Sequence, residues 1–170
     1  MLDVQTTHLD GVLQVKPLTA FEDFRGSYVE LYNEAEYAQS GIPVHFVQDD
    51  FSTSTRYVLR GIHGDRKTYK LISCLAGKLY LVIANCNDGV PQWLHWEAFT
   101  LSAENHCQIL VPPGFGVAHL VLSDWAIFHY KQSTYYDRAS QFTLSWNDPR
   151  LNIWWPISQP ILSRRDAGLE

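Results

Sequence analysis

Residues 70–84 read KLISCLAGKLYLVIA, which is two apolar runs separated by Ala76-Gly77. Both runs are rich in β-branched, aliphatic and aromatic residues, which favour extended backbone. A glycine between two such runs is typical of a tight turn. The sequence therefore predicts a strand over Lys70–Cys74, a turn, and a second strand over Lys78–Ala84.

The same pattern recurs in the rest of the chain. Turn signals such as Ser40-Gly41 and Pro112-Pro113-Gly114 stand about every ten residues. One short helix is predicted over Glu34–Ala38, and irregular structure from Arg150 onward. Many short strands at this spacing favour an all-β sandwich or barrel, which we expect to form one domain over residues 1–170. The further predicted strands are Val12–Val15, Tyr28–Tyr32, Ala98–Leu101, Gln108–Val111, Ala118–Leu122 and Ala126–Lys131.

The composition excludes several classes of protein. The chain has 170 residues, which suits one domain, and a net charge of -5, which offers no basic excess for nucleic acid. Its longest aliphatic and aromatic run, Leu79–Ala84, is far shorter than the ~20 residues of a membrane-spanning helix, and we recognise no secretory signal. Cys74, Cys86 and Cys107 lack C-x-x-C spacing, which favours buried thiols over a disulfide framework or a zinc site. We therefore expect a cytoplasmic protein with neither a nucleic-acid partner nor a membrane segment.

A small group of polar residues stands out because charged residues are only 18% of the chain. Arg60, His63, Asp65 and Lys70 fall within a span of eleven residues. The guanidinium of Arg60 offers paired donors to a phosphate, and His63 beside glycines can keep its ring free in a cavity. A surface arginine and a structural histidine are the alternative interpretation of these residues.

The predicted strand over Ala126–Lys131 has two distinct faces. Ala126, Phe128 and Tyr130 share one face, whereas His129 and Lys131 share the other. If the first face lines the inside of a barrel, Tyr130 points inward.

Residues Val111–His119 join a Pro-Pro-Gly turn to a strand that carries a histidine, and this resembles the second motif of cupin barrels. The first cupin motif normally supplies two histidines and an acidic residue as metal ligands. Here His63 is followed by Gly64 and Asp65, so the second histidine is missing. One histidine from each motif is a poor ligand set, and we expect no metal site.

Five ordered blocks resemble the dTDP-4-dehydrorhamnose 3,5-epimerase family: Phe21–Glu30, Phe46–Ser52, Leu59–His63, Trp146–Pro149 and Leu162–Asp166. The resemblance implies an all-β, cupin-like jelly-roll barrel with short flanking helical turns. It implies an isomerase that inverts C3, C5 or both in a nucleotide-diphospho-4-keto sugar, by proton abstraction beside the ketone and an enolate. No metal, nicotinamide or other cofactor is implied. By composition alone the last block would be a solvated tail.

The resemblance also implies roles for individual residues. His63 would be the base, and Asp166 would hold its other ring nitrogen. Tyr130 would donate a proton on the opposite face of the sugar, and Lys70 would stabilise the enolate. The implied substrate-binding residues are Arg60 and Arg165 for the diphosphate, Gln48 and Asp50 for the sugar or base, His119 for the sugar, Tyr136 beside the nucleotide, and Arg25, Tyr28 and Glu30.

The last three binding residues would reach the nucleotide site of a neighbouring subunit, because the family forms homodimers that exchange N-terminal strands.

Some departures from the family pattern leave the identity of the substrate open. The segment from His63 to Lys70 is shorter than usual, Asp50 stands where Asn is common, and extra residues precede His119. The short segment resembles a branch that acts on GDP-linked 4-keto heptoses. The alternatives are a C3-only epimerase of a GDP- or dTDP-linked sugar, a 3,4-ketoisomerase, and a non-catalytic cupin binding module.

Overall fold

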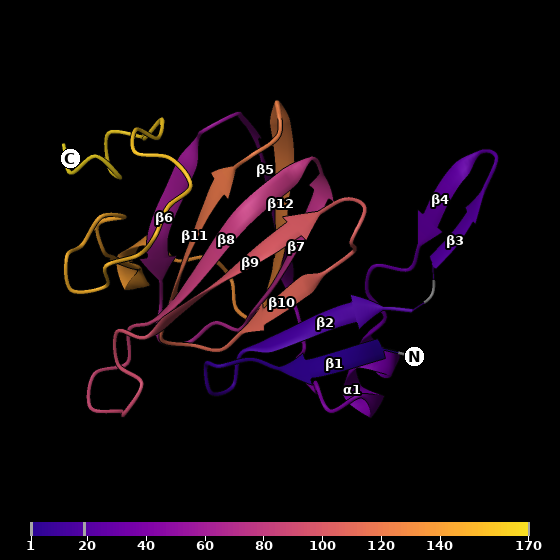
Figure 1. Ribbon diagram of the computed structural model, residues 1–170. Helices are drawn as coiled ribbons and strands as arrows, with labels where there is room; N and C mark the ends of the chain where they lie inside the picture. The colour runs from indigo at the N-terminus through magenta and orange to yellow at the C-terminus, as the bar shows by residue number, and fades with distance from the viewer. Residues whose placement is uncertain (1, 19, 170) are drawn as a thin grey trace.

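Eleven of the described strands form two antiparallel sheets that face each other as a jelly roll, which confirms the predicted all-β class (Figure 1). The computed structural model describes residues 2–18 and 20–169. The six-stranded sheet has the order β1 (Leu2–Thr6), β2 (Leu13–Pro17), β10 (Gln108–Val111), β7 (Lys70–Ala76), β12 (Trp125–Gln132) and β5 (Gln48–Thr55). The five-stranded sheet has the order β13 (Phe142–Thr143), β6 (Leu59–Gly64), β11 (Phe115–Val121), β8 (Lys78–Asn85) and β9 (Trp96–Ser102).

Alternation along the strands builds a core between the sheets and a cover on each outer face. Ile72 points into the central core, whereas its neighbour Leu71 packs on the outer face of the same sheet against Tyr37. Burying one aliphatic side chain of this kind stabilises the folded state by roughly 1.5–3 kcal/mol relative to leaving it exposed to water. Tyr37 belongs to α1 (Glu34–Gln39), whose first backbone N–H groups are capped by the Asn33 side chain. The predicted helix is therefore confirmed, and both faces of the sheet are covered near it.

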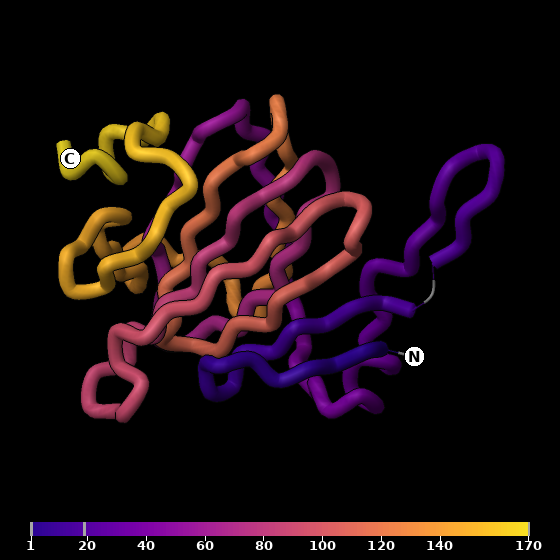
Figure 2. The backbone as a smooth tube through the Cα atoms, in the orientation of Figure 1, coloured from indigo at the N-terminus to yellow at the C-terminus, as the bar shows by residue number. Residues whose placement is uncertain are grey.

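The segment after β13 covers the outer face of the five-stranded sheet. Leu151 packs there against Ile62, Ala84 and Ala118. The predicted irregular structure beyond Arg150 is confirmed in the described part of the chain, where Ile161 makes a single bridge to Val58. This path brings the C-terminal residues beside β6, on the side of the molecule away from the N-terminus (Figure 2).

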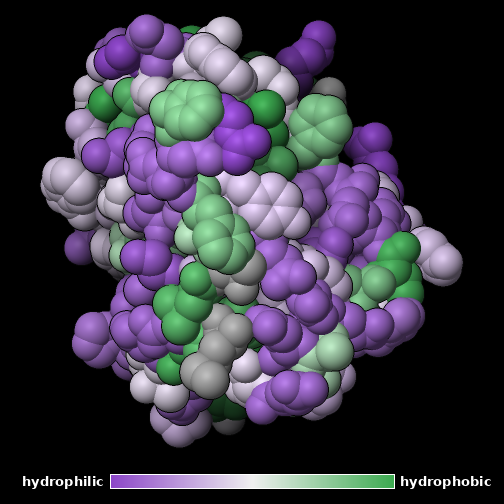
Figure 3. All heavy atoms as spheres, turned by 90° about the vertical axis from the view of Figure 1, so that its right-hand side faces the viewer, coloured by the Kyte–Doolittle hydropathy of each residue, from purple (hydrophilic) through white to green (hydrophobic). Residues whose placement is uncertain are grey.

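Strands β3 (Ala20–Asp23) and β4 (Gly26–Val29) pair only with each other in the described chain. Their hairpin projects from the body of the molecule (Figures 1 and 2). Its aromatic residues are exposed, and Phe24 at the tip is 98% exposed. On the face of the molecule that lies to the right in Figure 1, apolar residues reach the surface in several places among polar ones (Figure 3).

The strand predictions were incomplete where strands are polar or contain glycine. β5 reads QDDFSTST, and β6 contains Gly61 and Gly64, so neither has an apolar run. β1, β3, β13 and the 3-10 turn η1 (Arg138–Ser140) were also not predicted. The predicted strand over Tyr28–Tyr32 was wrong beyond Val29, because the chain leaves the hairpin there and turns toward α1. No helix among residues 2–18 and 20–169 is long and apolar enough to cross a membrane.

Candidate active site

A cavity of about 270 Å³ lies between the two sheets and gathers most of the predicted site residues. It is lined from both sheets and from the C-terminal segment. The predicted residues that line it are Asp50, Arg60, His63, Lys70, His119, Tyr130, Tyr136 and Arg165.

His63 and Asp166 form a short, partly buried pair. The distance from His63 Nε2 to Asp166 Oδ1 is 2.6 Å, and the Asp166 side chain is 3% exposed against 28% for His63. Burial raises the pKa of Asp166, but hydrogen bonds from His63 and Ser163 outweigh it and hold the pKa below its usual value. Asp166 is therefore a carboxylate that accepts the Nε2 proton, which leaves the lone pair on Nδ1 of His63. The segment that composition alone marks as a solvated tail folds back onto the cavity.

Tyr130 lines the cavity from β12, in the sheet opposite His63. It lies beside Phe128, with 5.4 Å between ring centroids, so the face expected from alternation is confirmed. On the other face Lys131 pairs with Asp49 at 2.8 Å. Burial, with the nearby charge of Asp50, raises the pKa of Tyr130 to about 12. The phenol is therefore protonated at neutral pH and can act as a proton donor.

His119 is buried against Phe128, with the two rings stacked at 4.0 Å between centroids. Burial lowers its pKa to about 3, and the positive charge of the Arg60 guanidinium adds to this effect. His119 is consequently neutral at physiological pH. Its Nε2 atom has no hydrogen-bond partner among the described residues.

The cavity carries more positive than negative side chains. Arg60 donates to Ser54 at 3.1 Å and Arg165 donates to Thr143 at 2.6 Å, but neither has a carboxylate partner in the described chain. Lys70 is 13% exposed, and burial lowers its pKa although the carboxylate of Asp65 acts in the opposite direction. Two guanidiniums without carboxylate partners give the cavity donors suited to a phosphate.

Gln48 supports the cavity wall without lining it. It donates to Asp50 at 2.8 Å and accepts from the backbone N–H of Tyr136 at 2.9 Å. Sequence reasoning missed Gln132, which also donates to Asp50, and Gln141. Gln132 follows Tyr130 by two residues on one strand face, a signal that would have found it. Gln141 follows η1 and has no comparable signal.

Arg25, Tyr28 and Glu30 are not brought to the cavity of their own chain. Arg25 lies on the projecting hairpin and pairs with Asp23 at 2.6 Å. Tyr28 is exposed on the same hairpin, and Glu30 accepts a hydrogen bond from Asn33 at 3.1 Å. These three residues therefore lie outside the cavity lining of their own chain.

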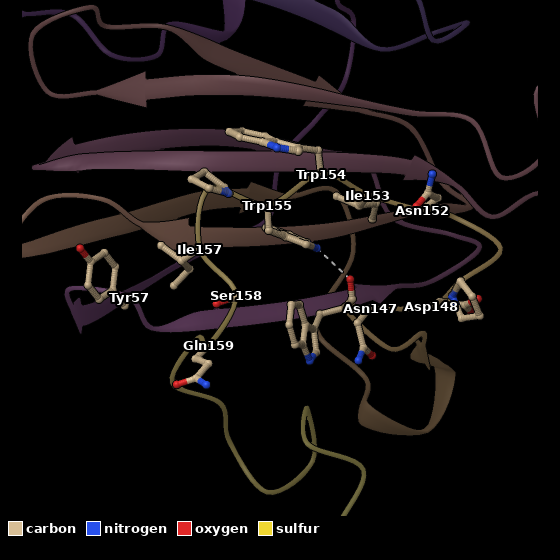
Figure 4. Close-up of a pocket in the computed structure, with 13 residues that line it drawn as sticks. Tyr57, Asn147, Asp148, Asn152, Ile153, Trp154, Trp155, Ile157, Ser158 and Gln159 are labelled. Carbon is tan, nitrogen blue, oxygen red and sulfur yellow. Dashed lines mark hydrogen bonds between the residues drawn. The ribbon is translucent and has the colours of Figure 1, made fainter.

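A second, wider depression of about 980 Å³ lies on the surface around Trp146–Gln159 (Figure 4). Trp154 and Trp155 lie along it, and the indole of Trp155 donates to the carbonyl of Trp146 at 2.9 Å. Its ionisable lining residues are Tyr57 and Asp148, and the latter is paired with Arg150. No histidine, lysine or arginine lines this depression in the described chain, and its one carboxylate is already paired. We therefore assign the chemistry to the cavity between the sheets.

Comparisons with known proteins show the family of the chain. The sequence profile of the dTDP-4-dehydrorhamnose 3,5-epimerase family matches residues 6–170. The dTDP-4-dehydrorhamnose 3,5-epimerase of Salmonella typhimurium is 38% identical, over 99% of this chain and 94% of its own. The chain belongs to this family. Its members are isomerases that act on sugar nucleotides, and the resemblance stated from the five blocks is confirmed.

The family likeness extends to the three-dimensional structure. A dTDP-6-deoxy-D-glucose-3,5-epimerase from Legionella pneumophila, solved with dTDP-4-keto-L-rhamnose, superposes with a TM-score of 0.93 and 36% identity. The match covers 99% of this chain and 91% of that one. A dTDP-4-dehydrorhamnose 3-epimerase from Streptomyces niveus is 30% identical, over 93% of this chain and 78% of its own. The family thus includes relatives named for two inverted centres and for one.

Proposed function

We propose that the protein epimerises a nucleotide-diphospho-4-keto sugar at C3, C5 or both, without a cofactor, and that dTDP is the nucleotide. The observation that carries this proposal is that His63 and Tyr130 line one cavity from opposite sheets. Inversion beside a ketone needs a base on one face of the carbon and an acid on the other. The dTDP-sugar relatives support the choice of nucleotide.

In the proposed reaction Nδ1 of His63 removes the proton on the carbon next to the C4 ketone. The C–H electron pair becomes a carbon–carbon double bond, and the carbonyl electrons move onto oxygen as an enolate. The Lys70 ammonium stabilises that negative charge. When the enolate collapses, the carbon takes the phenolic proton of Tyr130 from the opposite face. The resulting imidazolium and tyrosinate exchange protons with water, which restores the enzyme.

The nucleotide part of the substrate is proposed to bind beside the sugar position, through a separate set of residues. Arg60 and Arg165 would hold the diphosphate, and Tyr136 would lie beside the base. Arg25, Tyr28 and Glu30 would come from the hairpin of a second subunit in a homodimer. The unpaired hairpin and the exposure of Phe24 support this arrangement, because a lone projecting hairpin with exposed aromatics leaves apolar surface in water.

The proposal is tested by incubating the protein with dTDP-4-keto-6-deoxyglucose and with GDP-4-keto hexoses and heptoses, and by assigning each product by NMR. Epimers of the dTDP sugar support the proposal, and inversion at C3 alone identifies a 3-epimerase. If only the GDP sugars are epimerised, the proposed nucleotide is wrong and GDP replaces dTDP. A 3-keto product would instead identify a ketoisomerase. Binding without conversion, together with a stoichiometric transition metal, would identify a binding module.

A further inference from the structure

The carboxylate of Asp65 lies just behind the cavity wall, next to two residues that line it. Asp65 follows the end of β6 and is 2% exposed by its side chain. It is absent from the cavity lining, whereas Lys70 and Gln141 are part of it. Asp65 Oδ2 lies 4.0 Å from Lys70 Nζ and accepts a hydrogen bond from Gln141 Nε2 at 3.1 Å.

The two oxygens of Asp65 have different surroundings. Oδ1 accepts the backbone N–H groups of Lys67 and Thr68, both at 2.8 Å, and so fixes the turn that leads into β7. The Asp65 backbone carbonyl accepts from Gly114 at 2.7 Å, which ties the same residue to the start of β11. A purely structural role would need only these contacts. Oδ2 instead faces side chains that reach the cavity.

We propose that Asp65 is a positioning residue, which keeps the Lys70 ammonium charged and in place for the enolate without touching the substrate. At 4.0 Å the pair is not a hydrogen bond, so Lys70 Nζ keeps its donors free for a substrate oxygen. A buried ammonium is costly unless an opposite charge lies close to it. This inference rests on the proposed function, because it assigns Lys70 the task of holding an enolate.

The other charged and titratable groups around Lys70 do not replace Asp65. The charged and titratable groups that face the cavity, besides Lys70, are Asp50 from β5, Arg60 and His63 from β6, His119 from β11, Tyr130 from β12, Tyr136 and Arg165. Most of these are cationic or neutral, and Asp50 already accepts from Gln48 and Gln132. Asp65 is the group whose charge raises the pKa of Lys70 against the effect of burial.

The test measures the Lys70 ammonium directly. The chain has five lysines, so NMR of protein carrying ¹³Cε-lysine resolves each one, and Lys70→Arg assigns the signal. In Asp65→Asn the titration midpoint of Lys70 should fall by roughly one unit or more. The alkaline limb of the kcat profile should fall with it, and kcat near that limb should drop at least ~10-fold with KM little changed. Asp88→Asn is the matched control, because Asp88 is an exposed carboxylate that pairs with Arg66, the residue that follows Asp65 in the sequence.

Each outcome decides a separate question. An unchanged Lys70 midpoint in folded Asp65→Asn, or a rise in KM with an unmoved limb, would overturn the proposal. If the Lys70 midpoint falls in Asp65→Asn but the wild-type protein converts no sugar, the ion pair is supported and the proposed function is removed. If Asp65→Asn does not fold, Lys70→Met provides the reciprocal measurement. The titration midpoint of the Asp65 carboxyl should then rise, and an unchanged midpoint overturns the proposal.

Discussion

His119 shows how one residue can be polar, buried and neutral at the same time. Its ring is stacked on Phe128 and lies near the guanidinium of Arg60, so protonation is disfavoured by burial and by repulsion. A histidine in this state cannot donate a proton as an imidazolium at neutral pH. It lines the cavity wall, and in the proposed reaction the acid and base roles belong to Tyr130 and His63.

This state of His119 makes the stability of the fold depend on pH. The folded pKa is about 3, whereas the unfolded value is near 6.5, so the unfolded chain binds one more proton between these two values. Stability is then lost as the pH falls through that window, by up to about 1.4 kcal/mol per unit. His119→Phe should reduce the slope by that amount between pH 6 and 4, as measured by urea unfolding at each pH.

The control is His45→Phe, which changes a histidine that is exposed at the surface and paired with Glu34. The His119→Phe variant should lose more of the pH-dependent slope than this control does. His129 also has a lowered pKa from burial and contributes in both proteins. An unchanged slope in His119→Phe would show that His119 is not held neutral.

At the scale of elements, the sequence predicted the apolar strands, including β7, β11 and β12, which carry site residues, and missed the polar β5 and the glycine-containing β6. β7 and β8 were predicted because both of their faces are covered and their residues are apolar. β5 carries Asp50 and Ser52 toward the cavity, so its inward face is polar and its pattern is lost. The strand was therefore missed for a physical reason: a cavity for a polar ligand requires polar residues on the inward face, and these remove the alternation of apolar and polar residues that predicts a strand.

The site residues were predictable by a different route. No periodicity places Asp166 beside His63, because 103 positions separate them and the segment between them is largely irregular near its end. Only the family resemblance implied that contact. Alternation, by contrast, placed Tyr130 on the same strand face as Phe128, and the structure shows that this face lines the cavity.

The turn between β7 and β8 depends on Gly77. This residue has φ +74°, and a Cβ placed on it would collide with the backbone carbonyl of Trp125. Gly77→Ala should therefore destabilise the fold by more than about 2 kcal/mol, measured as the free energy of unfolding in urea. Gly89→Ala is the control, because Gly89 has a similar φ of +83° but open space around it.

The control should cost only about 1 kcal/mol of backbone strain. Equal losses in the two variants would contradict the role of close packing at Gly77.

At the scale of the whole molecule, the cavity of one chain lacks the hairpin residues that the proposed site requires. Arg25 and Tyr28 lie on a hairpin that pairs with nothing else in the described chain. A homodimer in which each hairpin enters the partner's site would complete both cavities. The proposal then requires that each active site contain residues from two chains.

Subunit complementation tests this requirement. Arg25→Glu disables the hairpin, and His63→Ala disables the cavity, so each variant alone should have little activity. Co-expressed together, they should form mixed dimers in which one site pairs the intact cavity of one chain with the intact hairpin of the other. Activity above the sum of the two variants is the expected result, with a dimer mass by light scattering. Purely additive activity, or a monomer mass, would contradict the shared site.

The central claim is that His63 removes a proton from the carbon beside the ketone. It is tested most directly by incubating the enzyme with dTDP-4-keto-6-deoxyglucose in heavy water and following deuterium at C3 and C5 by NMR. The wild type should incorporate deuterium at C3, with or without C5, and His63→Ala should slow incorporation at least ~100-fold. His106→Ala, away from the cavity lining, should match the wild type. Incorporation by His63→Ala at the wild-type rate would contradict the account.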